Sequence, residues 1–456
     1  MRLDHIGIDL QLGWFRNLMN GWKRTLASVA QDIQWSSDDM KRIFQGKTDI
    51  EELQALAVAM SRVYPTTLEK LLLPSDDTRN GVLIMRAQDS QASSRIYERL
   101  NGLNETVPYY EYRDTAMSVL SPIKPEWIKE EVTIDDTDPD NPHVVYNKGH
   151  FEHQMTFFIG PVNFYYQVRG TSYMAEMNTG DSNYITPFNP HSFTSRDADR
   201  LGLIIAVTFE GDVARAQKEM YLLGRERGAD RFYLDASNGP RAQIKLLHQH
   251  MRAEYLQPQD LPALLPGTGI TAEDILDETR PFSQEERAVL AEKLHIEPKD
   301  LLVSEYNEKA QVPVQRHDPA IARRYPNSDT PQYLIHPLVR SPWMPHMKGF
   351  NIDVLAPEPD LETGFESPLH QYLFNYGDTP IDIAWTVDGH THQDTLGPED
   401  SVYLQPWIRT AFGQADQETG QLLILGVSGA INSSVQHELS RMPDIKRVSK
   451  ETTGWF

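Results

Sequence analysis

Apolar residues between positions 9 and 73 recur at helical rather than strand spacing. Leu26, Val29, Ala30 and Ile33 lie three or four residues apart, so their side chains share one face of a helix. The predicted helices are short, about three turns each, which is typical of a helix-turn-helix bundle. The chain therefore begins with a small helical region.

Two helix starts can be placed from their N-cap residues. The run S-S-D-D at 36–39 is rich in side chains that accept hydrogen bonds from the first turn of a helix. Ser283 stands three residues before Glu286, which is the spacing of a capping box. Residues 212–305 therefore form a second helical region.

The pattern changes to β-strand from Gly81 onward. V-L-I-M at 82–85 and Y-Y-E-Y-R at 109–113 are runs of the apolar and aromatic residues that strands favour. Strands continue to about Phe209 and resume after Pro331.

The two strand-rich regions match each other in sequence. H-Q-M-T-F-F-I-G at 153–160 corresponds to H-Q-Y-L-F-N-Y-G at 370–377, and D-S-N-Y-I-T-P-F-N-P-H-S-F at 181–193 to D-S-V-Y-L-Q-P-W-I-R-T-A-F at 400–412. We therefore expect an α+β fold of two repeats, each a small helix-turn-helix-like unit plus a cupin (double-stranded β-helix) barrel. The expected boundaries are 1–75 and 212–305 for the helical units, and 76–211 and 306–456 for the barrels.

The first barrel carries a histidine pattern between Tyr146 and Ser195. His150, Glu152 and Gln154 alternate along a predicted strand and would share one face of it. Further along the chain, His191 follows a loop that is bounded by prolines. Imidazole and oxygen donors without thiolate suit Fe(II), Mn(II) or Zn(II), and such a set leaves positions open for substrate and O2.

The third ligand stays open at this point. A carboxylate binds a divalent ion better than a neutral amide does, so geometry alone favours Glu152 over Gln154. The competing interpretation is that all of these residues are polar groups lining an ordinary barrel. The histidine after a Gly-Asp turn and a proline favours the metal interpretation.

The second barrel has lost the histidines. In the matched segments His150 corresponds to Ser367 and His191 to Thr410, whereas Gln154 is retained as Gln371. We expect the barrel at 306–456 to be degenerate and metal-free, with one metal ion per chain. The retained glutamine also weakens a purely catalytic interpretation of Gln154.

Composition narrows the class of protein. A formal charge of −22, from 43 basic and 65 acidic residues, argues against nucleic-acid and anionic membrane partners. A run at 36–46 resembles a recognition helix, but Lys41 and Arg42 are its only basic residues. The absence of cysteine excludes disulfides and thiolate sites. Without a membrane span or a signal peptide, a cytoplasmic protein is expected.

Four motifs carry a family resemblance over nearly the whole chain. M-N-G-W-K-R-T at 19–25, N-K-G-H at 147–150, G-D-S at 180–182 and P-H-S at 190–192 resemble the phosphonate-cleaving tandem cupins. That family contains hydroxyethylphosphonate dioxygenase and methylphosphonate synthase, and hydroxypropylphosphonate epoxidase is a more distant relative.

The resemblance implies a choice of ligands. In the dioxygenase a glutamate ligand stands six residues before the second histidine, and this chain has Ile185 there. An isoleucine at that position, with a glutamine four residues after the first histidine, is similar to the methylphosphonate synthase branch. The implied ligands of Fe(II) are then His150, Gln154 and His191, and Glu152 is not one.

The resemblance also implies the reaction. A non-haem Fe(II) oxygenase would cleave the carbon–carbon bond of 2-hydroxyethylphosphonate with O2, giving methylphosphonate and a one-carbon product at the level of carbon dioxide. The substrate supplies four electrons, so neither 2-oxoglutarate nor an external reductant is expected. The alternatives are a dioxygenase that makes hydroxymethylphosphonate and formate, and a cupin-fused regulatory protein.

The family motifs nominate the residues that bind the phosphonate. They are Lys23, Arg99, Tyr112 and Asn147, of which Lys23 and Tyr112 are also candidates for a direct role in catalysis. Lys23 lies in a helical unit and would reach a barrel from outside as a lid. A homo-oligomer is compatible with this expectation, and whether Lys23 acts in its own chain stays open.

Overall fold

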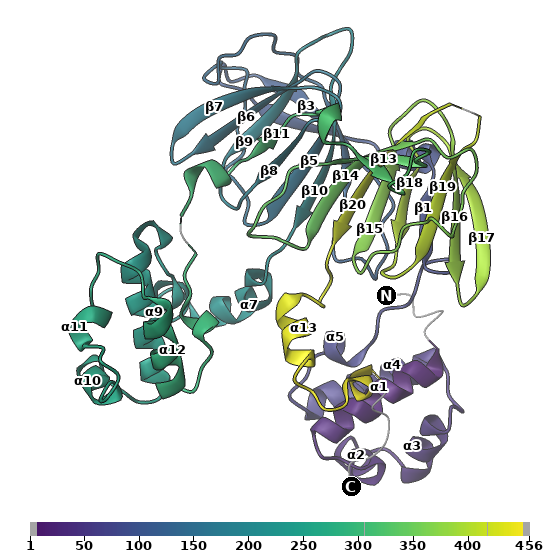
Figure 1. Cartoon of the computed structure of the whole chain (residues 1–456). Helices are drawn as coiled ribbons and strands as arrows, with labels where there is room; N and C mark the ends of the chain where they lie inside the picture. The colour runs from purple at the N-terminus through teal and green to yellow at the C-terminus, as the bar shows by residue number, and fades with distance from the viewer. Residues whose placement is uncertain (1–6, 305, 417, 450–456) are drawn as a thin grey trace. The chain divides into compact units, whose positions relative to one another are not determined.

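The computed structural model describes residues 7–304, 306–416 and 418–449 (Figure 1). The chain forms two compact units. One comprises Met1–Phe209 and Pro313–Phe456, and the other is Glu210–Val312. Within the described residues no helix is both long and apolar enough to cross a membrane.

The first helical region has the predicted periodicity. Its helices are α1 (Ile8–Gly21), α2 (Leu26–Asp32), α3 (Ser37–Phe44), α4 (Ile50–Val63) and α5 (Leu68–Leu71). Val29 and Ala30 are buried in a common core with Leu12, Phe15 and Leu56. The predicted start of α3 is confirmed, since its N-cap Ser36 accepts a hydrogen bond from the Asp39 amide.

The first pair of sheets follows. A seven-stranded sheet has the order β11-β8-β5-β10-β4-β3-β2, and a three-stranded sheet has the order β7-β6-β9. The strands are β2 (Arg95–Leu100), β3 (Thr106–Asp114), β4 (Glu126–Glu130), β5 (His153–Ile159), β6 (Val162–Val168), β7 (Thr171–Met177), β8 (Ser182–Ile185), β9 (His191–Ser195), β10 (Leu203–Phe209) and β11 (Val314–Gln315), with helix α6 (Ala87–Ala92) before β2. Phe158 of the larger sheet contacts Phe164 and Phe193 of the smaller one, so the two sheets pack face to face.

The second pair of sheets has the same strand order. Its seven-stranded sheet runs β1-β18-β15-β20-β14-β13-β12, and its three-stranded sheet runs β17-β16-β19. The strands are β1 (Val82–Met85), β12 (Arg323–Tyr325), β13 (Tyr333–Pro337), β14 (Met347–Val354), β15 (His370–Asn375), β16 (Ile381–Val387), β17 (His390–Leu396), β18 (Ser401–Leu404), β19 (Arg409–Gln414) and β20 (Gly420–Val427), and helix α13 (Ser433–Leu439) follows. The matched segments also share a contact, because His153 meets the Tyr184 hydroxyl at 2.8 Å and His370 meets the Tyr403 hydroxyl at 2.8 Å.

Each pair of sheets borrows one strand from the other repeat. β1, which the sequence analysis assigns to the first barrel, instead pairs with β18 of the second. In the same way β11 pairs with β8 of the first. Each borrowed strand is followed by an arginine that binds the aspartate of a Gly-Asp or Glu-Asp turn: Arg86 lies 2.7 Å from Asp400 and Arg316 lies 2.9 Å from Asp181. The strand that follows the expected boundary at residue 76 therefore belongs to the second pair of sheets and not to the first.

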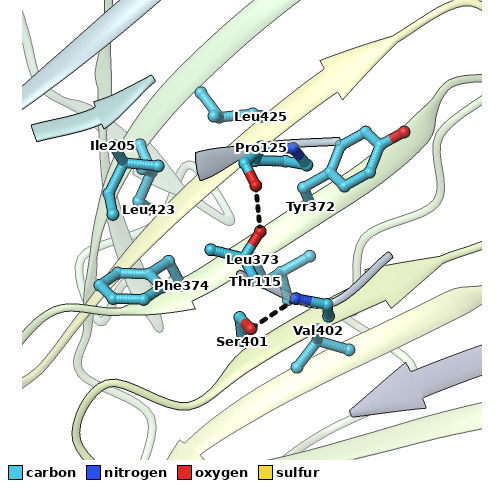
Figure 2. A pocket seen from close by; sticks show the side chains of 11 residues that line it. Thr115, Pro125, Ile205, Tyr372, Leu373, Phe374, Ser401, Val402, Leu423 and Leu425 are labelled. Carbon is cyan, nitrogen blue, oxygen red and sulfur yellow. Dashed lines mark hydrogen bonds between the residues drawn. The ribbon is translucent and has the colours of Figure 1, made fainter. Parts of the chain in front are cut away.

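The two seven-stranded sheets pack against each other. Met155 and Phe157 of β5 share one core with Tyr372 and Phe374 of β15. A void of about 10 Å³ lies at this interface, and Figure 2 shows the mostly apolar side chains that line it. A space of that size holds at most one water molecule, so this is a packing interface and not a ligand site. Two hydrogen bonds join residues of the lining: Thr115 Oγ1 donates to the Pro125 carbonyl at 2.7 Å, and the Ala116 amide donates to Ser401 Oγ at 2.8 Å.

The second compact unit is helical. It contains α7 (Val213–Leu223), α8 (Ala229–Phe232), α9 (Gly239–Ala253), α10 (Leu261–Leu264), α11 (Ala272–Ile275) and α12 (Gln284–Lys293). The predicted capping box of α12 is confirmed, since Ser283 accepts from the Glu286 amide and the Glu286 carboxylate accepts from the Ser283 amide. Leu247, Met251 and Leu290 form its core.

Candidate metal and substrate site

The first pair of sheets contains a cavity of about 150 Å³. Six residues nominated from the sequence line it: Arg99, Tyr112, Asn147, His150, Gln154 and His191. They come from β2, β3, the segment before β5, β5 itself and the first residue of β9. The fold therefore brings together side chains that are up to 92 residues apart in the sequence.

Both histidines present the same ring nitrogen to the cavity. His150 Nδ1 lies 2.9 Å from the carbonyl of Glu152, and His191 Nδ1 lies 2.9 Å from the carbonyl of Asn189. A backbone carbonyl only accepts hydrogen bonds, so Nδ1 carries the hydrogen and Nε2 keeps its lone pair. Metal-binding histidines are oriented by this kind of contact.

The two histidine rings are close together, and that of His191 is uncharged. Their centroids lie 5.2 Å apart with the planes at 89°. Burial lowers the pKa of His191 to about 3, so this imidazole is neutral at physiological pH. A neutral imidazole is the form that binds metal ions.

Gln154 brings a carboxamide oxygen next to the histidines. Its Nε2 donates to Thr156 Oγ1 at 2.9 Å, and its Oε1 lies 3.2 Å from His150 Nε2. The oxygen and the unprotonated nitrogen are both acceptors, so they repel each other unless a cation lies beside both. The residues present therefore fit a divalent ion held by two imidazoles and a carboxamide oxygen.

Glu152 lies on the wrong side of His150 to join this set. Its Oε2 is 3.5 Å from His150 Nδ1, the ring edge opposite to Nε2. The expectation that residues 150, 152 and 154 share one strand face is wrong, because β5 begins only at His153 and the two-residue alternation does not extend to Glu152. Within the described ranges no three His, Cys, Asp or Glu side chains are grouped closely enough to hold a metal ion.

Ile185 lies across from Gln154. The two are register partners on β8 and β5, and Ile185 is buried. An apolar side chain at this point offers no fourth protein donor to an ion.

Asn147 shapes the loop before β5. Its Oδ1 accepts from the amides of Gly149 at 2.9 Å and His191 at 3.0 Å. Gly149 has a φ of +71°, and a Cβ there would lie 2.6 Å from the backbone of Phe188, so only glycine fits. This loop therefore holds both histidines in place.

One wall of the cavity carries hydrogen-bond donors. Arg99 donates to the Val145 carbonyl at 2.7 Å, and its guanidinium carbon lies 5.0 and 4.8 Å from the ring centroids of Tyr109 and Tyr110. Burial raises the pKa of Tyr112 to about 12, so its hydroxyl stays protonated. A cation and neutral hydroxyls on one wall suit an oxyanion.

Three lining or supporting residues escape the sequence motifs. Tyr110 and Glu126 line the cavity from β3 and β4, and Thr156 supports Gln154 from β5. The two-residue alternation places Tyr110 on the same face as Tyr112 and Thr156 on the same face as Gln154, which is the signal that could have found these two. No nominated residue lies on β4, so the pattern gives no such signal for Glu126.

Lys23 does not line the cavity. It is exposed, follows α1, and has a φ of +55°. The structure of this chain therefore does not bring its ammonium group to the other candidates.

The matched position in the second pair of sheets is filled. The backbone of Phe365 bonds to Thr410 in both directions, at 2.6 and 2.9 Å. The Phe365 ring stacks on Tyr325 and lies 4.7 Å from Tyr333. An aromatic cluster therefore lies next to Thr410, the residue matched to His191.

Comparison with known proteins places the chain in a family. No profile of a known protein family matches. The sequence is 36% identical over 450 residues to a methylphosphonate synthase of Nitrosopumilus maritimus (strain SCM1), covering 97% of this chain and 94% of that protein. The structure resembles Streptomyces albus hydroxyethylphosphonate dioxygenase with 2-hydroxyethylphosphonate and Fe(II) bound, with a TM-score of 0.83, 32% identity and coverage of 98% and 99% of the two chains.

A more remote structure, PhpD with cadmium and the phosphonate, has a TM-score of 0.68 at 18% identity over 98% of this chain and 100% of its own, and it supports the fold alone. The extent and level of the sequence identity show that this chain belongs to the family of methylphosphonate synthase and hydroxyethylphosphonate dioxygenase.

Proposed function

We propose that this protein is an Fe(II)-dependent oxygenase that converts 2-hydroxyethylphosphonate and O2 to methylphosphonate and a one-carbon product at the level of carbon dioxide. Written with carbon dioxide, the reaction balances with one water: the phosphonate loses its hydroxymethyl carbon, and O2 accepts the four electrons that the substrate supplies. Neither 2-oxoglutarate nor a reductant enters this balance. Each pair of sheets is, on this proposal, a cupin barrel, and only the first is catalytic.

The observation that carries the proposal is the neutral donor set. His150, Gln154 and His191 would hold the iron, which supplies O2 activation when bound. Because none of the three is charged, the ion keeps its full double charge toward the cavity. This favours an anionic substrate that binds through a phosphonate oxygen and its hydroxyl.

The other cavity residues would bind and orient the phosphonate. Arg99 supplies a cation, while Tyr112 and Asn147 supply a hydroxyl and an amide that donate hydrogen bonds. Tyr112 keeps its proton at neutral pH, because burial raises its pKa to about 12. These three donors would fix which end of the substrate faces the metal position.

Lys23 would add a second cation after closure of the helical region or from another copy of the chain. Lys23→Ala should then raise the apparent substrate KM about tenfold or more without changing iron content. An unchanged KM would leave Lys23 as an ordinary exposed lysine. Mixing the Lys23→Ala chain with an inactive His150→Ala chain separates the two routes, since activity returns only if Lys23 acts between chains.

The alternative product, hydroxymethylphosphonate with formate, is supported by the likeness to the Streptomyces albus dioxygenase structure. Phosphorus NMR separates the two products. Protein loaded with Fe(II) without oxygen is given 2-hydroxyethylphosphonate and then air. Methylphosphonate as the main phosphorus product supports the proposal, and hydroxymethylphosphonate with formate overturns it. Persistence of substrate under both conditions would favour the regulatory alternative, which the charge of −22 opposes.

A further inference from the structure

The carboxamide of Gln154 has two chemically different ends, and the structure gives each a separate neighbour. Oε1 lies 3.2 Å from His150 Nε2, and Nε2 donates to Thr156 Oγ1 at 2.9 Å. Gln154 is 5% exposed and Thr156 is 0% exposed, so bulk solvent has little access to the contact between them. The direction of the amide is therefore decided by protein atoms.

Direction matters for an amide ligand more than for a carboxylate. A carboxylate binds a metal ion through either of two equivalent oxygens, whereas the NH2 end of a carboxamide has no free lone pair. The terminal torsion of glutamine is broad and roughly two-fold, so the side chain itself does not choose. The hydrogen-bond partner of the NH2 group therefore determines which end of the amide faces the metal position.

Without the Thr156 hydroxyl the buried NH2 group would lose its acceptor. His150 Nε2 is an acceptor within reach of the amide, and it keeps its lone pair because Nδ1 donates to the Glu152 carbonyl. A rotation of the amide would satisfy both groups with one hydrogen bond. The rotation would occupy His150 Nε2 and turn Gln154 Oε1 away, so two of the three metal-binding atoms would be lost to the ion.

The second repeat provides an internal comparison. Gln371 stands where Gln154 stands, but Leu373 replaces Thr156, and Ser367 and Thr410 replace the two histidines. The repeat that keeps both histidines therefore has a hydroxyl two residues after the glutamine. The repeat that lacks the histidines has no hydroxyl there. A purely structural role in the sheet would not require this difference, since β5 and β15 have the same partners in their sheets.

We propose that Thr156 is a positioning residue, which accepts from the NH2 of Gln154 and so turns the carboxamide oxygen toward the metal. The inference rests on the proposed function insofar as that function makes Gln154 a ligand. In a two-histidine, one-carboxylate site either carboxylate oxygen can bind the metal, so no residue has to fix the direction of the ligand. Here Thr156 fixes that direction.

The test is the affinity for Fe(II), measured without oxygen by competition with a chromophoric chelator. Thr156→Val should weaken Fe(II) binding 10–100-fold, the usual range for losing a residue that orients a ligand. Thr156→Ser keeps the hydroxyl and should stay within about threefold of the natural protein. The matched control is Thr194→Val on β9, equally buried at 0% exposure and outside the cavity lining, which should bind iron normally.

A second background separates positioning from packing. In Gln154→Glu the ligand has two equivalent oxygens, so adding Thr156→Val should change the Fe(II) affinity much less than it does beside Gln154. Equal losses in the two backgrounds would overturn the proposal, as would unchanged binding by Thr156→Val. Thr156→Ala serves as a second hydroxyl-free variant. If both hydroxyl-free variants unfold while Thr156→Ser folds, the hydroxyl is structural and the proposal fails.

Gln154→Ala is measured in parallel to keep two failures apart. If Gln154→Ala binds iron normally, Gln154 is not a ligand, and the donor set of the proposed function fails. If Gln154→Ala loses iron but Thr156→Val does not, only the positioning role of Thr156 fails.

Discussion

Asn147 Nδ2 lies 2.9 Å from His191 Nε2 and donates a hydrogen bond to the nitrogen that faces the cavity. The same side chain accepts from two backbone amides through Oδ1. An ion bound to His191 would use the lone pair of Nε2, so the Asn147 amide could no longer donate to that nitrogen. The amide would then be free to donate to a phosphonate oxygen.

Asn147→Asp should separate the role of this side chain in holding the loop from its role in binding the substrate. The carboxylate can still accept from the amides of Gly149 and His191, but it cannot donate, and it repels an anionic substrate. We expect iron content to be retained and the substrate KM to rise about tenfold or more. Steady-state kinetics with iron analysis of the same sample checks this, and an unchanged KM would exclude Asn147 from substrate binding.

Iron stoichiometry tests the asymmetry of the two repeats. Purified protein should bind about one Fe(II) per chain, because only the first pair of sheets keeps both histidines. His150→Ala and His191→Ala should each abolish binding. His370→Ala is the control, since His370 bonds to the Tyr403 hydroxyl in the second pair. Elemental analysis showing two irons per chain would contradict the assignment.

Glu152 and Gln154 can be set against each other directly. Glu152→Gln should keep near-normal iron content, because its carboxylate lies beside His150 Nδ1 and away from Nε2. Gln154→Ala should lose iron or activity, since it removes the carboxamide oxygen that lies 3.2 Å from His150 Nε2. The opposite pattern would indicate an ordinary two-histidine, one-carboxylate centre and would remove the main support for methylphosphonate as the product.

Glu111 should make stability depend on pH under acid conditions. Burial alone would raise the pKa of its carboxyl, but hydrogen bonds from Lys129, Ser94 and Arg113 outweigh burial and lower it to about 2 from 4.5. A folded-state pKa below the unfolded value means that the stabilisation is complete above pH 4.5 and is lost as the pH falls toward 2.

Glu111→Gln should therefore lower the free energy of unfolding by about 2–3 kcal/mol at neutral pH and have little effect near pH 2. Urea unfolding at several pH values measures this difference. A difference that does not change with pH would show that the carboxylate charge is not responsible.

Several features of the chain are determined locally and could be predicted from the sequence. The helices of the first region follow from apolar spacing, and Ser36 and Ser283 mark helix starts through contacts only three residues long. The repeat can be recognised because matched segments preserve residue order. Six of the seven nominated site residues line one cavity, since short motifs keep ligand-bearing residues next to the turns that orient them.

Other features depend on contacts between distant parts of the chain, and only the tertiary structure decided them. β1 pairs with β18, more than 300 residues away, because a strand edge is satisfied by whichever partner the fold places beside it. The alternation that would put Glu152 on the same face as Gln154 fails because β5 begins only at His153, and the residue pattern does not locate that start. The contact of Thr156 with Gln154 depends on rotamers inside a closed core, and residue order does not encode them.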